Sequence, residues 1–388
     1  MGYKTYSCPV SRSCGGCEWL AVPYPIQLER KQRAIEELFD DISEDARLLP
    51  IIGMDEPLRC RCKVIVPFAR GKGGSLRYGL YAKGSHRIIE RPDCLVEAEQ
   101  ATPILETIAK LAKSFKIVPY DEDTGRGFLR NVLLRIGHST GQVLVCLVCA
   151  GDQFRSSKAF VRRLREAHPE VDTVVMNVNK RQTNVVLGDT EHVLFGTGWI
   201  EDELLGCRFR ISASSFFQVN PVQTEKLYSA AVDAAGLDAS TTILDAYCGT
   251  GTIGIIAASR HGSPLVGVES NAKAIKDARV NAKRNGLEKA KFVTEDAGTF
   301  MRKRAADGRG FDVVFMDPPR AGADEAFLDS LAALSPARVV YISCNPKTQV
   351  RDVAHLMKRG YRLETNQPVD MFPHTKHVET VCLLSKNT

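Results

Sequence analysis

Short runs in which apolar and polar residues alternate dominate the first half of the chain. Alternation with a period of two is typical of half-buried strands, and it marks residues 61–69, 131–137, 142–150, 173–178 and 184–187. Apolar residues at helical spacing mark three further segments, which are 26–39, 98–115 and 156–167. This mixture predicts an α+β domain with an antiparallel sheet.

The pattern changes near residue 221, after which helical and strand-like segments alternate. The expected helices are 222–235, 252–260, 272–285, 324–334 and 347–359, and the expected strands are 242–246, 264–269, 291–294, 312–316, 338–343, 361–369 and 377–385. Repeated strand–helix units predict an α/β, Rossmann-like domain with a doubly wound, mostly parallel sheet, whose ligands bind at the carboxyl ends of the strands. We place this domain at 213–388, after an α+β domain at 1–212 whose helix 26–39 is a candidate to pack on the second.

The composition is that of an ordinary globular protein. The 388 residues are 44% hydrophobic and 25% charged, and no run of about 18 uncharged apolar residues could span a membrane. The first residues lack the apolar core of a secretory signal, so the expected location is the cytoplasm. A net charge of +6 permits a nucleic-acid partner but does not require one.

A glycine-rich loop follows the expected strand 242–246. Gly249, Gly251 and Gly254 fit the G-x-G-x-x-G pattern, which lets a backbone turn tightly and meet a nucleotide at a helix N-terminus. Glu269, at the end of the next strand, is placed to hold ribose hydroxyls. The pattern fits a nicotinamide cofactor nearly as well as S-adenosylmethionine. Asp245 favours the second, because a carboxylate beside the loop attracts an ammonium and a sulfonium and repels a pyrophosphate.

Two more strand ends should meet this loop at the same edge of the sheet. One carries D-P-P-R from Asp317, and the other carries S-C-N-P from Ser343, which includes Cys344. A thiolate that adds to C6 of a pyrimidine makes C5 nucleophilic, and a base such as Glu379 then removes the C5 proton. A D-P-P loop also occurs in enzymes that methylate exocyclic amines, which need no thiol. A lone cysteine at a strand end is also more often a small buried hydrophobe.

Five motifs in this order resemble those of the bacterial RNA (uracil-5-)-methyltransferase family: S-F-F-Q-V-N at 215–220, D-A-Y-C-G at 245–249, D-P-P-R at 317–320, S-C-N-P at 343–346 and H-V-E at 377–379. The resemblance implies a class I methyltransferase domain that methylates C5 of a uracil in RNA. It also implies that Cys344 is the nucleophile and Glu379 the base.

The same resemblance implies which residues contact S-adenosylmethionine: Gln218, Tyr247, Glu269, Asp296 and Asp317. Gln218 and Asp317 are also candidates to touch the uracil. Tyr247 stands where many members carry phenylalanine, which keeps the aromatic ring. Asp296 fits the role less well, because it equally suits a helix N-cap.

Four of the twelve cysteines form a set with adjacent glycines, whose backbone N–H groups could reach sulfur; they are Cys8, Cys14, Cys17 and Cys94. Zinc is an alternative, although four-cysteine zinc sites usually contain two C-x2-C pairs and this set of four contains one. The resemblance implies that the first domain carries a [4Fe–4S] cluster on these four thiolates. Cys60 and Cys62 alternate on a strand and face opposite ways, so we interpret them as structural. We interpret Cys146, Cys149, Cys207 and Cys382 in the same way and assign no role to Cys248.

RNA is the expected partner. Basic clusters at 59–63, 70–72, 158–165 and 302–304 are candidates to track phosphates, although solvated charged faces look the same. The chain resembles the short family members that methylate 23S ribosomal RNA, and other relatives methylate the T-loop uridine of transfer RNA. Stacking shields C5, so the target base should be flipped into a pocket. We expect a monomer without a membrane partner.

Overall fold

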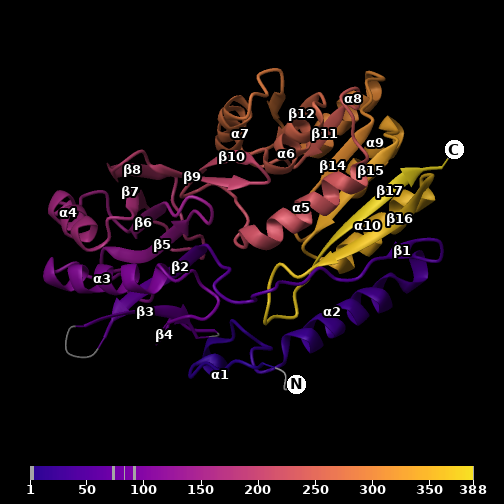
Figure 1. Ribbon diagram of the computed structural model, residues 1–388. Helices are drawn as coiled ribbons and strands as arrows, with labels where there is room; N and C mark the ends of the chain where they lie inside the picture. The colour runs from indigo at the N-terminus through magenta and orange to yellow at the C-terminus, as the bar shows by residue number, and fades with distance from the viewer. Residues whose placement is uncertain (1–3, 72–74, 83, 91–92, 388) are drawn as a thin grey trace.

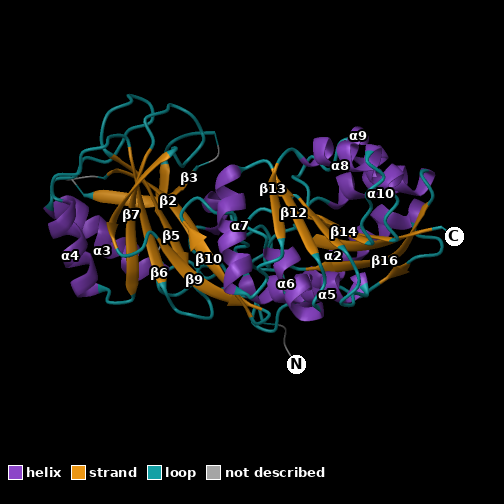
Figure 2. Ribbon diagram, turned by 90° about the horizontal axis from the view of Figure 1, so that it is seen from above, coloured by secondary structure: helices purple, strands orange, loops and turns teal. Residues whose placement is uncertain are grey.

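The computed structural model describes residues 4–71, 75–82, 84–90 and 93–387. Two β-sheets lie side by side, with a β-hairpin and the helix α7 (Ala272–Arg284) between them (Figures 1 and 2). The hairpin consists of β9 (Trp199–Leu204) and β10 (Cys207–Ser212). No helix in these ranges is both long enough and apolar enough to cross a membrane.

The larger sheet confirms the Rossmann-like, doubly wound architecture that the second half of the chain predicts. Its spatial order is β1 (Arg47–Leu48), β16 (Tyr361–Val369), β17 (Glu379–Lys386), β15 (Arg338–Ser343), β14 (Val313–Met316), β11 (Ile243–Ala246), β12 (Leu265–Glu269) and β13 (Lys291–Thr294). Only β17 is antiparallel to its neighbours among these strands. The chain order reverses between β11 and β14, which is where such sheets bind ligands.

Helices cover both faces of the larger sheet. One face packs against α5 (Pro221–Ala235), α6 (Thr252–His261) and α7, together with the hairpin. The other face packs against α2 (Tyr24–Phe39), α8 (Ala297–Ala306), α9 (Glu325–Leu334) and α10 (Pro346–Lys358). α2 comes from the first half of the chain, yet its Ile35 and Phe39 are buried in the same core as α10.

The smaller sheet has the spatial order β4 (Ile88–Glu90), β3 (Leu76–Tyr81), β2 (Lys63–Arg70), β5 (Leu129–Ile136), β6 (Val143–Cys149), β7 (Val171–Val178) and β8 (Thr190–Phe195). Its pairs are antiparallel except β6–β7. This pair is parallel because α4 (Ser157–Ala167) crosses between its strands. α4 and α3 (Ala101–Ser114) cover one face, and Leu133 and Cys146 on the other face join the core that contains the hairpin.

The sequence interpretation is wrong at residues 184–187, which form no strand. The carbonyl groups of Val185 and Val186 accept hydrogen bonds of 2.7 and 2.9 Å from the side chain of Asn179 instead of from a neighbouring strand. β8 follows as an exposed edge strand without apolar alternation. The elements β3, β4, β9 and α8 are also not predicted, nor are the short α1 (Ser11–Cys14), η1 (Asp40–Ile42) and β1.

The division into 1–212 and 213–388 stays a prediction. One apolar core runs from β5 and β6 through the hairpin to α5, so packing is continuous across the expected boundary. β1 and α2, which precede that boundary, both lie against the larger sheet. Lys72 of the basic cluster 70–72 lies outside the described residues.

Candidate active site

The glycine-rich loop leaves β11 at Tyr247, whose φ of 65° lies in the left-handed region. Gly249 and Gly251 also have positive φ values, 53° and 82°, and Gly251 is the N-cap of α6. A positive φ is easy for glycine and rare for a residue with a large side chain. The turn places the N-terminus of α6 at the carboxyl edge of the larger sheet, where helix N–H groups bind ligands.

Asp245 holds this loop against β11. Its Oδ2 accepts a hydrogen bond of 3.0 Å from the backbone N–H of Gly254, and a Cβ added at Gly254 would lie 2.7 Å from the same oxygen. Burial, with the negative charges of Asp317 and Glu269, raises the pKa of Asp245 to about 8, although the bond from Gly254 opposes the rise. The carboxyl group expected to face a cationic cofactor therefore also orders the glycine loop.

Glu269 ends β12 beside the same loop. Its Oε1 accepts a hydrogen bond of 2.8 Å from the backbone N–H of Asn271, and its Oε2 accepts one of 3.3 Å from the N–H of Gly249. The residue is half-buried. A carboxylate accepts about four hydrogen bonds in all, so Glu269 keeps capacity for a ligand while its position beside the loop is fixed.

Cys344 and Glu379 lie next to each other because β17 is antiparallel to β15. Ser343, the last residue of β15, pairs with Thr380, so the register brings Cys344 beside Glu379 at the start of β17. The side chain of Gln349 holds this end of β17, since its Oε1 accepts a hydrogen bond of 2.5 Å from the hydroxyl of Thr380. The two predicted catalytic residues thus meet through backbone pairing.

Burial and mutual repulsion raise the pKa values of the acidic groups here. Burial, followed by the negative charge of Asp317, raises the pKa of Glu379 to about 8, and the positive charge of Arg320 opposes this. Burial raises the pKa of Asp317 to about 7. Burial and the charges of Glu379 and Asp317 also raise the pKa of the Cys344 thiol, whereas Arg320 lowers it. Groups with shifted pKa values gather at functional sites.

Arg320 is a candidate functional residue to which the sequence interpretation gave no role. The positive charge of its side chain lowers the pKa of the Cys344 thiol, because a cation beside a thiol favours the thiolate. The side-chain amide of Asn345 donates a hydrogen bond of 2.9 Å to the carbonyl of Arg320, and the hydroxyl of Thr348 donates one of 3.3 Å. The D-P-P-R and S-C-N-P loops therefore form one bonded unit.

Gln218 joins this group through Tyr228 of α5. Burial raises the pKa of the Tyr228 hydroxyl, the charges of Asp317, Glu379 and Asp245 add to the rise, and the side chain of Gln218 opposes it. The sequence gave no signal for Tyr228, because it occupies one apolar position of an amphipathic helix. The structure thus connects Gln218 to the edge that carries Cys344.

Tyr247 and Asp296 are the two remaining residues that we expect to contact S-adenosylmethionine. The ring of Tyr247 packs against Phe327 of α9, with 5.4 Å between centroids. Asp296 is exposed and is the N-cap of α8, where its Oδ1 accepts a hydrogen bond of 2.8 Å from the N–H of Thr299. The capping role that the sequence left open for Asp296 is therefore present, and its carboxylate also acts on the Tyr247 hydroxyl.

The N-terminal cysteines gather beside α1. The pKa of the Cys17 thiol rises to about 11, mainly through burial, and the thiols of Cys94, Cys14 and Cys8 add to the rise while Arg61 opposes it. The four predicted ligands thus lie within electrostatic reach of Cys17. Across the described parts of the chain, however, no three His, Cys, Asp or Glu side chains are arranged to hold a metal ion. The structure does not confirm the expected cluster.

Cys60 and Cys62 have different surroundings. Burial raises the pKa of the Cys60 thiol to about 11, and Asp370 and Cys94 add to the rise. The thiol of Cys62 is buried, and its pKa is raised first by burial and then by the negative charges of Asp202 and Cys60. Cys60 therefore lies within electrostatic reach of Cys94.

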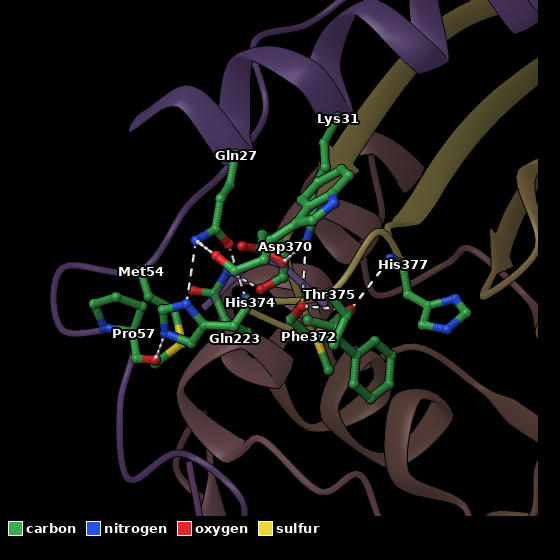
Figure 3. Close-up of polar contacts among 12 residues, drawn as sticks. Gln27, Lys31, Met54, Pro57, Gln223, Asp370, Phe372, His374, Thr375 and His377 are labelled. Atoms are coloured by element: carbon green, nitrogen blue, oxygen red, sulfur yellow. Dashed lines mark hydrogen bonds and ion pairs between the residues drawn. The ribbon is translucent and has the colours of Figure 1, made fainter. Parts of the chain in front are cut away.

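The loop between β16 and β17 is held by α2. Lys31 donates hydrogen bonds of 2.5 Å to Asp370 and 3.1 Å to the carbonyl of Phe372, and the Lys31 and Asp370 side chains are fully buried. Figure 3 shows Gln27 beside this ion pair, bonded to both the backbone N–H and the ring of His374 at 2.9 and 3.2 Å. Helix α2 thus fixes the loop that leads into Glu379.

A sequence model of the tRNA (uracil-5-)-methyltransferase family matches residues 157–387. An uncharacterized RNA methyltransferase of Halalkalibacterium halodurans is 41% identical over 379 residues, which cover 97% of this chain and 82% of that protein. One of Listeria monocytogenes is 40% identical over 383 residues, which cover 98% and 83%. The chain belongs to the RNA (uracil-5-)-methyltransferase family.

The fold agrees with this membership. The structure is similar to the crystal structure of the Pyrococcus abyssi tRNA (uracil-54, C5)-methyltransferase in complex with S-adenosyl-L-homocysteine, with a TM-score of 0.80 and 29% identity. The similarity covers 95% of this chain and 85% of that one. The part of the chain built on the larger sheet therefore has the class I methyltransferase fold, and the chain is an S-adenosylmethionine-dependent RNA methyltransferase.

Lys31→Met should lower the free energy of unfolding by about 3–5 kcal/mol, because it leaves Asp370 charged and buried without its partner. Urea denaturation monitored by tryptophan fluorescence measures the change. Lys110→Met is the matched control, since Lys110 forms an exposed pair with Glu106, and it should cost less than about 1 kcal/mol. Adding Asp370→Asn to Lys31→Met should restore part of the loss. Equal stability of Lys31→Met and the wild type would contradict the prediction.

Proposed function

We propose that this enzyme methylates C5 of a uridine in RNA, with Cys344 as nucleophile and Glu379 as base. The observation that carries the proposal is the strand register that puts these two side chains next to each other at the edge where the glycine loop lies. Methylation of an exocyclic amine needs neither a thiol nor a second base beside it. The pairing of Cys344 with Glu379 therefore favours carbon methylation.

The thiol of Cys344 has to become a thiolate before it can attack. Burial and then the negative charges of Glu379 and Asp317 raise the pKa of this thiol, and Arg320 lowers it. Arg320 is thus the residue that stabilises the negative charge on sulfur, and the position of its backbone is held by Asn345. The side chain of Cys344 is half-buried, so a flipped uracil can reach it while bulk water is largely excluded.

The reaction then follows from the positions of the residues. The thiolate of Cys344 adds to C6 of the uracil, and the resulting enolate has its negative charge spread over C5 and O4. S-adenosylmethionine supplies the methyl group that C5 takes. Glu379, as a carboxylate, removes the proton from C5, and the electrons of that bond expel the Cys344 thiolate from C6. The products are 5-methyluridine, S-adenosylhomocysteine and a protonated Glu379.

We propose that the cofactor is held by residues on both sides of the glycine loop; they are Gln218, Tyr247, Glu269, Asp296 and Asp317. Glu269 has the best-defined place, since its carboxylate is bonded to the N–H of Gly249. Asp296 contributes through its exposed oxygen, because its other oxygen caps α8. Gln218 and Asp317 lie within the group around Tyr228, between the cofactor loop and Cys344. These two residues are therefore placed to contact the uracil as well.

Two kinds of RNA are candidates for the substrate that carries the target uridine. The motif resemblance supports 23S ribosomal RNA, which we propose as the substrate. Transfer RNA is the second candidate, because the similar archaeal structure is that of an enzyme for uracil-54 of tRNA, and the likeness covers both sheets of this chain. The two candidates share the chemistry at Cys344 and differ in the fold of RNA around the uridine.

We also propose that Cys8, Cys14, Cys17 and Cys94 hold a [4Fe–4S] cluster. The grouping of their thiols around Cys17 supports this, and four thiolates are the usual ligands of such a cluster. A Cβ added at Gly16 would lie 3.4 Å from the sulfur of Cys14, so the backbone of Gly16 lies close to that sulfur. When bound, the cluster would hold the N-terminal segment, and the reaction at Cys344 needs no step through it.

RNA that contains 5-fluorouridine should form a covalent adduct with the enzyme when S-adenosylmethionine is present, because fluorine at C5 cannot leave as a proton. The adduct should survive denaturing electrophoresis. Cys344→Ser should form none and lose methyl transfer, since a hydroxyl is a far weaker nucleophile. Cys382→Ser is the control at a thiol buried elsewhere in the same sheet. Full activity of Cys344→Ser would instead support methylation of an amine. Comparing 5-fluorouridine-substituted 23S ribosomal RNA with substituted transfer RNA identifies the substrate.

The rate of methyl transfer at limiting RNA should rise with pH through about 8, the raised pKa of Glu379, and ionisation of the Cys344 thiol, whose pKa is also raised, adds to the rise. Glu379 acts as a base only when ionised, and its ionised fraction changes about tenfold per pH unit below that pKa. Glu379→Gln should accumulate the covalent intermediate on ordinary uridine, because C5 keeps its proton. Adduct formation with 5-fluorouridine serves as the control, since it needs Cys344 but no proton removal. A flat profile from pH 6 to 9 would contradict this assignment.

Protein purified without oxygen should be brown and contain about four iron and four acid-labile sulfide ions per chain. Cys94→Ser should lose most of the iron, and Cys60→Ser is the matched control, because Cys60 lies near Cys94 but is expected to be structural. Iron and sulfide assays with absorption spectra give the measurement. Colourless protein with bound zinc, or iron loss in Cys60→Ser alone, would contradict the proposed ligand set.

A further inference from the structure

A pocket of about 260 Å³ lies between the N-terminal cysteine segment and the active-site loops. One side of the pocket is lined by Gly15 and Gly16 of the cysteine segment and by Arg61, which lies just before β2. The other side is lined by Arg320, Phe372 and His377 of the active-site loops. Pockets for drug-sized ligands are typically about 300–1,000 Å³. This pocket is smaller, so it suits the phosphate and sugar of a single nucleotide.

The pocket adjoins the place where the target base would react. Arg320 lines it, and its carbonyl accepts a hydrogen bond of 2.9 Å from the side chain of Asn345, the residue that follows Cys344. A base attached to the Cys344 sulfur through C6 would therefore have its own sugar and phosphates within a short distance of the pocket. A polynucleotide extends from both sides of a flipped nucleotide, so one of its neighbouring phosphates has to pass this region.

The pocket lining carries a net positive charge, because Arg61 and Arg320 outnumber Glu18. Within the described ranges, neither Arg61 nor Arg320 forms an ion pair, and Glu18, the acidic residue of the lining, is 3.8 Å from Lys376. The pKa of His377 is lowered by burial and then by the positive charge of Arg320. Arginine side chains that lack an anionic partner at a partly enclosed site are suited to bind a phosphate.

The walls of the pocket are formed before any ligand arrives. Phe372 and His377 belong to the loop that α2 holds, and Figure 3 shows the His377 ring turned away from the buried bonds of that loop. On the opposite wall, a Cβ added at Gly15 would have no atom within 4 Å, and one at Gly16 would approach only the Cys14 sulfur. Because these two glycines carry no side chains, the pocket stays open on this side.

We infer that this pocket binds the RNA phosphate next to the target uridine, with Arg61 and Arg320 on the phosphate and Phe372 and His377 against the adjoining nucleotide. The inference rests on the proposed function and deepens it. It gives the N-terminal cysteine segment a second task, which is to form one wall of the RNA site beside Cys344. Arg61 acts on binding of the RNA and takes no part in the chemistry.

The test measures how RNA affinity depends on salt. A fluorescein-labelled nonauridylate is titrated with the enzyme between about 50 and 300 mM KCl, because each phosphate contact to a single strand contributes about 0.7 to the slope of log K against log salt. Arg61→Gln should lower that slope by about 0.7 and weaken binding about tenfold at the lowest salt. Arg61→Lys should keep the slope, since it keeps the charge. S-adenosylmethionine affinity should stay the same in both variants.

Arg309→Gln is the matched control, because Arg309 is exposed in the turn before β14, at the opposite edge of the larger sheet. It should leave the slope unchanged. An Arg61→Gln enzyme that binds RNA with the wild-type slope overturns the inference, while the 5-fluorouridine adduct still tests the proposed function separately. A wild-type enzyme that forms no adduct and binds no RNA overturns both.

A second measurement avoids any change to the protein, should Arg61→Gln fail to fold or lose iron. A methylphosphonate, which is uncharged, replaces the phosphate on one side or the other of a central 5-fluorouridine. Neutralising one of the two phosphates should weaken binding to the wild-type enzyme about tenfold, and neutralising the other should have a much smaller effect. Equal affinity for both modified RNAs and the unmodified RNA overturns the inference.

Discussion

The antiparallel pairing of β17 with β15 is the constraint on which the active site depends. In a fully parallel sheet, the first residue of a strand lies at the edge away from the ligands, about 17–20 Å from the last residue of a typical strand. Because β17 is reversed, its first residue, Glu379, lies at the same edge as the residue that follows β15, Cys344. The bond between Gln349 and Thr380 then fixes where this reversed strand begins.

This arrangement costs stability, because it collects acidic groups in a poorly solvated place. Asp245, Asp317 and Glu379 have pKa values of about 8, 7 and 8 in the folded chain, compared with ordinary values of 3.8, 3.8 and 4.5. The folded state therefore holds these protons more tightly than the unfolded state does. The stability that these groups contribute to the folded state is therefore greatest below about pH 4, and it is lost as the pH rises through 7 and 8. Arg320 offsets part of this cost for Glu379, and a cationic cofactor would offset more.

Most of the larger sheet was predictable because its strands are buried on both faces and its helices have clear caps and apolar spacing. The first half was harder to predict: β8 is exposed at an edge, and residues 184–187 have the apolar content of a strand but give their carbonyls to Asn179. Motif reasoning named Cys344 and Glu379 but could not show that they meet, since strand order and direction are not local properties. It missed Tyr228 and the role of Arg320 because neither differs, in sequence, from an ordinary helix or loop residue.

The ion pair between Lys31 and Asp370 joins residues that are 339 positions apart. Trp19 adds a bond of 2.9 Å from its backbone N–H to the carbonyl of His374. During synthesis, α2 therefore leaves the ribosome long before the buried charge of Lys31 has a partner. The candidate active site can be completed only after the segment that carries Asp370 and Glu379 has been made.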